Sequence, residues 1–167
     1  HASFWNFVRK GPKEMGVFTE AMYRIERDMC EPITSWSIPV QDPPDIVVNF
    51  GAKKIGVEIT ELVNYKALHA QLHEPERYGA ELVQYGEDIA KTKLNEIILE
   101  KEEKLLPVVN QYDAIFLLVH TDEPALSSDQ FRNWRVNLSL SILRRIYLLF
   151  SYEPAYGECP LVCIYSG

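Results

Sequence analysis

The alternating residues 55–62 constrain the fold more than any other part of the chain. Aliphatic side chains recur at alternate positions and define one face of a strand, while Glu58 and Thr60 lie on the other face. Residues 45–50 precede this run and are rich in β-branched side chains, and Gly51 marks a tight reversal between the two. We therefore expect the two segments to form an antiparallel β-hairpin.

Three other segments have the apolar spacing of helices. Residues 13–30 and 87–106 carry an apolar side chain every three or four positions, and a proline follows each segment. Residues 128–150 are predicted to form a further helix, with Ser127 or Ser128 as its N-cap. Its second half is apolar almost all round, which favours burial.

Strands are predicted at residues 33–40, 114–119 and 161–165, and the continuous apolar run 114–119 is typical of a central strand covered on both faces. Residues 63–86 have no clean period and are predicted to be an irregular insert with short helices. The predicted elements follow one another in the order helix, three strands, helix, strand, helix and strand. This order predicts an α/β fold with a mixed sheet flanked by helices. The length of 167 residues fits a single domain, residues 1–167.

The composition is that of an acidic globular protein, with 17 basic residues, 24 acidic residues and a net charge of −7. Bulk charge does not favour a polyanion, although residues 127–150 hold four arginines against one aspartate and indicate a local basic face. The apolar run 146–150 is far too short to span a bilayer, so no membrane partner is expected. Cys159 and Cys163 lie about 13 Å apart along a predicted strand, which is beyond disulfide reach and favours reduced thiols and a cytoplasmic location.

A pair of carboxylates is predicted at the open end of the hairpin. Asp45 follows Pro44 where one strand begins, and Glu58 lies on the polar face of the next strand. Two carboxylates brought together repel one another, and a divalent cation with a preference for oxygen ligands, Mg²⁺ or Mn²⁺, relieves that repulsion. The alternative is that Asp45 is a turn residue and Glu58 is an exposed strand residue.

Lysines on the helix 87–106 provide a second indication. Lys101 falls close to the centre of the apolar stripe, and Lys93 falls towards its edge. A lysine in an apolar seam requires an anionic partner or a phosphate. The alternative is a side chain whose stem lies on apolar surface while its ammonium reaches solvent.

The residues Pro44-Asp45 and Glu58-Ile59-Thr60 resemble the motif of the PD-(D/E)xK nuclease superfamily, which has the restriction-endonuclease-like fold. The family's αβββαβ core maps onto residues 13–120, with residues 127–167 as an αβ extension. The resemblance implies that Asp45 and Glu58 bind the metal ion.

The motif lysine is replaced by Thr60 in this chain. Some branches of the family carry the lysine on the following helix, where Lys101, or failing that Lys93, would serve. We expect its ammonium within roughly 7 Å of Glu58, and the carboxylates of Asp45 and Glu58 roughly 4–6 Å apart. Glu61, or Glu26 on the first helix, would extend the metal shell.

The resemblance implies a nuclease that hydrolyses phosphodiester bonds of nucleic acid with Mg²⁺ or Mn²⁺, with DNA favoured over RNA. A homodimer or a protein partner is compatible with this expectation. The alternative is an inactive binding module or inhibitor on the same fold, which the net charge of −7 and Thr60 favour. Zinc is not expected at His69 and His73, because no third ligand is evident. Trp134 either stacks on a nucleic acid or anchors a buried helix.

Overall fold

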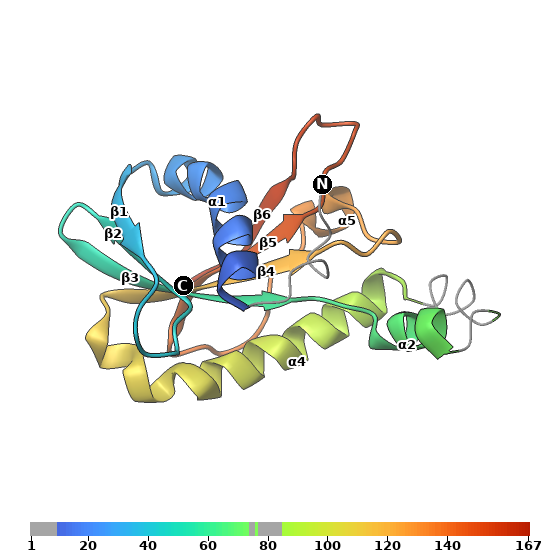
Figure 1. The fold of residues 1–167 in the computed structure, drawn as a ribbon, viewed down its shortest axis with the longest axis horizontal. Helices are drawn as coiled ribbons and strands as arrows, with labels where there is room; N and C mark the ends of the chain where they lie inside the picture. The colour runs from blue at the N-terminus through green and yellow to red at the C-terminus, as the bar shows by residue number, and fades with distance from the viewer. Residues whose placement is uncertain (1–9, 74–75, 77–84) are drawn as a thin grey trace.

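The computed structural model describes residues 10–73, 76 and 85–167 and has an α/β fold (Figure 1). Its helices are α1 (Lys10–Met29), α2 (Tyr65–His73), α4 (Glu87–Leu105) and α5 (Ser128–Arg132), and the 3₁₀ helix η2 (Leu106–Gln111) follows α4. Its strands are β1 (Ile33–Ser37), β2 (Ile46–Phe50), β3 (Lys53–Glu61), β4 (Ala114–Thr121), β5 (Leu143–Phe150) and β6 (Leu161–Ser166).

The six strands form one mixed sheet in the order β1-β2-β3-β4-β5-β6. The pairs β3–β4 and β4–β5 are parallel, and the other three pairs are antiparallel. This arrangement confirms the predicted α/β fold with a mixed sheet flanked by helices. In the described residues, no helix has the length and apolar character needed to cross a membrane.

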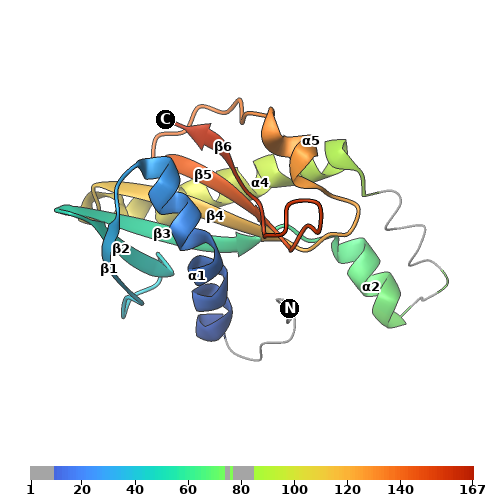
Figure 2. The same ribbon diagram turned by 90° about the horizontal axis from the view of Figure 1, so that it is seen from above.

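Helices α1 and α4 cover opposite faces of the sheet (Figures 1 and 2). The central strand β4 serves both layers, because Ile115 and Leu117 pack in the cluster beneath α4 while Phe116 and Leu118 pack in the cluster beneath α1. All four of these side chains are buried. The continuous apolar run of β4 therefore reflects burial on both faces, as expected.

The hairpin of β2 and β3 is confirmed. Ile46 pairs with Val57 and Phe50 pairs with Lys53, and Gly51 occupies the turn with a φ of +55°. A side chain is strained in this left-handed region, so glycine suits the position. The register fixes which side chains share a face at the start of β2, and this determines the geometry of the site below.

The prediction of a helix over residues 128–150 is wrong beyond Arg132. Helix α5 ends at Arg132, and the apolar second half is the strand β5 between β4 and β6. A strand covered on both faces is apolar at every position, and a buried helix has the same pattern, so periodicity could not distinguish them. The chain after β4 is therefore α5, β5 and β6.

The insert predicted at residues 63–86 begins with the helix α2. Residues 74–75 and 77–84 of this insert lie outside the described part of the chain. The strand predicted at residues 33–40 is shorter than expected and ends at Ser37.

Candidate metal site

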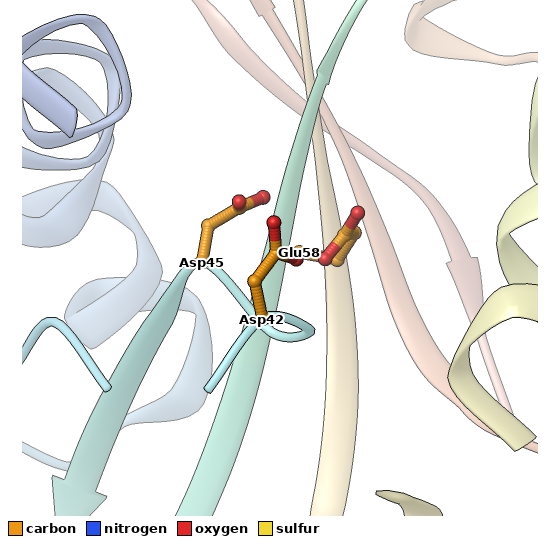
Figure 3. Close-up of side chains that lie close together, drawn as sticks. All are labelled: Asp42, Asp45 and Glu58. Carbon is orange, nitrogen blue, oxygen red and sulfur yellow. The ribbon is translucent and has the colours of Figure 1, made fainter. Parts of the chain in front are cut away.

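Three carboxylates meet where β2 begins beside the middle of β3 (Figure 3). Asp42, Asp45 and Glu58 each place an oxygen within 4.8 Å of an oxygen of the other two. Asp45 precedes Ile46, which pairs with Val57, so the antiparallel register places Asp45 beside Glu58 on one face of the sheet. The predicted approach of Asp45 and Glu58 is confirmed.

Asp42 is a member of the cluster that the sequence did not predict. Its side chain comes from the loop before β2 and is exposed, whereas Asp45 and Glu58 are buried. The path of the loop brings Asp42 to the site. Because a loop has no periodic pattern, the sequence does not predict where this side chain lies.

Two lysines of α4 contact the buried carboxylate of Glu58. The Nζ atoms of Lys101 and Lys104 both lie 2.8 Å from Glu58 Oε1. Lys104 Nζ also lies 3.3 Å from Asp42 Oδ1. The predicted proximity of Lys101 to Glu58 is confirmed. Lys104 was missed, although residues three apart on a helix share a face and the spacing from Lys101 could have indicated it.

The charges of this site compensate one another. Glu58 is 0% exposed, and an isolated carboxylate buried to this extent would be very unstable in its ionised form. The two ammonium groups provide the compensation. Burial lowers the pKa of Lys104, but its hydrogen bond to Glu58 and the charges of Glu58 and Asp42 outweigh this effect and raise the pKa. Lys104 therefore stays protonated at neutral pH.

Backbone and side-chain contacts hold the carboxylates in place. Asp45 Oδ2 accepts a 2.7 Å hydrogen bond from the backbone N–H of Ile59. Glu58 Oε1 is occupied by the two lysines, whereas its Oε2 is buried and has no hydrogen-bond partner among the described residues. A buried oxygen without a partner is uncommon in folded proteins.

The donor set fits a hard divalent cation. Mg²⁺ and Mn²⁺ prefer carboxylate oxygens, and three of these are within one cation's reach. The orphaned Glu58 Oε2 is an oxygen that a cation would satisfy. Asp42, Asp45 and Glu58 would therefore hold Mg²⁺ or Mn²⁺.

The structure does not bring the other predicted site residues to this cluster. Lys93 Nζ pairs with Glu96 at 2.9 Å on the outer surface of α4. Glu26 Oε1 accepts a hydrogen bond from the backbone N–H of Ile33, which pairs with Phe50 at the far end of the hairpin. The prediction that Glu26 extends the metal shell beside Asp45 and Glu58 is therefore wrong. The same holds for Glu61.

Glu61 lies on the face of the sheet opposite to Glu58, because successive side chains of a strand alternate and the two are three residues apart. Burial is the main cause that raises the pKa of Glu61 from 4.5 to about 7. The charge of Asp122 adds to this effect, and Lys13 opposes it. Glu61 therefore belongs to the layer of α1 rather than to the carboxylate cluster.

The fold and the site together define an α/β protein with a candidate cation site on one face of a mixed sheet. Comparisons of the chain with models of known protein families, with curated proteins and with solved structures found no match.

Proposed function

We propose that the protein is a divalent-cation-dependent nuclease that hydrolyses phosphodiester bonds of nucleic acid, with DNA as the favoured substrate. The observation that carries this proposal is the meeting of Asp45 and Glu58 with Lys101 at one buried point. Two acids and a lysine are the residue types that the resemblance to the PD-(D/E)xK superfamily implies for such a site.

The arrangement of the chain around the site also supports the proposal. The series α1-β1-β2-β3-α4-β4 follows the order of the superfamily core, apart from the additional helix α2. Thr60 occupies the position of the motif lysine, and Lys101 comes from the helix that follows the motif strand. A lysine supplied from this helix is one of the variations that the family resemblance allows.

In this proposal, Asp42, Asp45 and Glu58 hold the cation. When bound, the cation would lower the pKa of a water molecule and offset negative charge on the phosphate. Lys101 and Lys104 compensate the charge of the buried Glu58 and present two ammonium groups to the scissile phosphate. Since Lys104 stays protonated, it contributes charge and hydrogen bonds rather than accepting a proton.

The test is a cleavage assay with single- and double-stranded DNA and RNA at increasing Mg²⁺ or Mn²⁺. We expect cation-dependent cleavage by the wild type and a rate at least about a hundredfold lower for Asp45→Asn, Glu58→Gln and Lys101→Met. Lys93→Ala, on the same helix but paired with Glu96, is the matched control and should cleave at the wild-type rate. Full activity of Asp45→Asn, or no cleavage by the wild type, would contradict the proposal.

A second candidate function is a binding module without catalysis, and one observation favours it. Glu58 is 0% exposed and two lysines already share its Oε1, so much of its charge is compensated without a cation. For a binding module, the same variants should lower stability but reveal no cleavage. Mn²⁺ should also leave the melting temperature of the wild type unchanged.

A further inference from the structure

A pocket of about 390 Å³ lies beside the edge strand β6, between α1 and α5. Arg24 and Arg27 from α1 line it together with Arg132 and Arg135 from the end of α5 and the segment that follows it. We call it the arginine pocket. Tyr147 of β5 lines it from the α1 face, whereas Val162 of β6 belongs to the cluster beneath α4. The pocket therefore lies at the β6 edge of the sheet, separated from Glu58 on β3 by β4 and β5.

Both carboxylates that line the arginine pocket already have a cationic partner. Asp28 Oδ2 lies 2.5 Å from an Nη atom of Arg145 and accepts a 2.8 Å hydrogen bond from the Tyr147 hydroxyl. Glu158 Oε2 lies 3.0 Å from an Nη atom of Arg24. These two acids therefore do not neutralise the remaining arginines of the pocket.

The remaining arginines carry uncompensated or weakly compensated charge. Arg135 donates to the backbone carbonyls of Arg132 and Trp134, at 3.0 and 2.7 Å, and pairs with no carboxylate in the described part of the chain. Arg27 forms no ion pair with any described residue. Arg132 pairs at 3.2 Å with Asp129, but both side chains are more than half exposed, so water screens this pair.

We propose that the arginine pocket binds the phosphate monoester of a nucleotide, either as a free nucleotide or as the terminal phosphate of a nucleic-acid strand. Planar guanidinium groups match phosphate oxygens in pairs, and Arg27 and Arg135 together balance a dianion. Concentrating arginines around one pocket in a chain of net charge −7 creates a local field that favours such an anion. The volume is in the range of small-molecule pockets, about 300–1,000 Å³.

The test is isothermal titration calorimetry with adenosine 5′-monophosphate in buffer that contains EDTA, so that no cation takes part. We expect binding by the wild type, at least tenfold weaker binding by Arg27→Ala and Arg135→Ala, and no binding of adenosine. Arg144→Ala is the matched control, because Arg144 is an exposed arginine of β5 that does not line the pocket. This variant should bind within twofold of the wild type.

Competition with short DNA strands then distinguishes the two sources of the phosphate. Displacement of the nucleotide by a 5′-phosphorylated strand, but not by its 5′-hydroxyl counterpart, assigns the pocket to strand ends. Displacement by neither strand assigns it to free nucleotides. Equal displacement by both strands, unchanged affinity in Arg27→Ala, or no binding of the nucleotide would overturn the proposal.

Two further controls separate this proposal from the nuclease proposal and from misfolding. Asp45→Asn should bind the nucleotide like the wild type, because the carboxylate cluster lies at β2 and β3 and the pocket lies at the β6 edge of the sheet. Failure of one proposal therefore leaves the other standing. Arg27 is exposed, and circular dichroism should show the same unfolding transition for Arg27→Ala as for the wild type. Arg27→Lys retains the charge without the planar group and should bind with an intermediate affinity.

Discussion

At the scale of single residues, the site depends on how the charge of Glu58 is compensated. A buried ion pair is costly to break, because removal of one partner leaves the other buried without compensation. Glu58 has two cationic partners on the same oxygen, so either lysine can maintain part of the compensation when the other is lost. This redundancy has a measurable consequence for stability.

We expect Lys101→Met and Lys104→Met each to lower the free energy of unfolding by about 1–2 kcal/mol. The double variant should lose about 2 kcal/mol more than the sum of the two, because only then is Glu58 without a cation. Glu58→Gln in the double variant should recover most of this additional loss. Urea unfolding at pH 7 measures the free energies of the wild type and of all four variants, and strictly additive losses would contradict shared compensation.

Glu61 gives a residue-scale prediction for pH. Its pKa is raised from 4.5 to about 7, first by burial, so the folded state binds the proton more tightly than the unfolded chain. The free energy of unfolding therefore falls as the pH rises from about 4.5 to about 7. We expect Glu61→Gln to raise the free energy of unfolding by about 1–2 kcal/mol at pH 8, after discounting the shift for partial exposure, and to leave it unchanged at pH 4. If Glu61→Gln changed the free energy of unfolding equally at pH 8 and at pH 4, the raised pKa would not belong to Glu61.

At the scale of elements, the start of β5 is held by a carboxylate of α4. Glu102 accepts hydrogen bonds from the backbone N–H groups of Ser141, Ile142 and Leu143, the last at 3.0 Å. Burial raises the pKa of Glu102, but these hydrogen bonds outweigh it and lower the pKa below its ordinary value. At pH values above the ordinary pKa of a glutamate, the ionised carboxylate of Glu102 therefore stabilises the contact between α4 and the start of β5.

We expect Glu102→Ala to lower the free energy of unfolding at pH 7 by about 1–2 kcal/mol, because three backbone donors lose their acceptor. The contribution of Glu102 should disappear as the pH falls through the lowered pKa, so the variant and the wild type should converge in acid. Glu103→Ala, at an exposed neighbouring position, is the matched control. A constant difference between Glu102→Ala and the wild type down to pH 2 would argue against an ionised acceptor.

The same contact shows where sequence reasoning about elements reached its limit. The hairpin of β2 and β3 was predictable because one face is aliphatic and Gly51 marks the turn. Strand β5 was not, because burial on both faces removes the alternation that identifies a strand. The anchoring of its start by Glu102 is a long-range contact that local periodicity does not encode.

The site was predictable to a similar degree. Asp45 and Glu58 followed from the register of the hairpin, and Lys101 followed from its angle on α4. Asp42 depends on the path of a loop, so only the structure shows it. Glu26 shares the apolar stripe of α1 with buried residues, but the sequence does not indicate that its carboxylate binds the backbone of β1.

At the scale of the whole molecule, the sheet separates two features of opposite charge. The carboxylate cluster lies on the α4 face of β2 and β3, and the arginine pocket lies at the β6 edge, between α1 and α5. Our two proposals therefore assign a cation and an anion to separate places on a chain of net charge −7. The nuclease proposal concerns only the first of these, and the cation is its essential component.

The most direct test of the central claim is a calorimetric titration of Mn²⁺ into the wild type and into Asp45→Asn, without nucleic acid present. Our account predicts saturable binding by the wild type and at least tenfold weaker binding by the variant, because Asp45 would lose its charge while keeping its size. Glu100→Gln, which changes an exposed carboxylate of α4, should bind Mn²⁺ like the wild type. Equal affinities of the wild type and Asp45→Asn, or no saturable heat from the wild type, would contradict the assignment of a cation site to Asp42, Asp45 and Glu58.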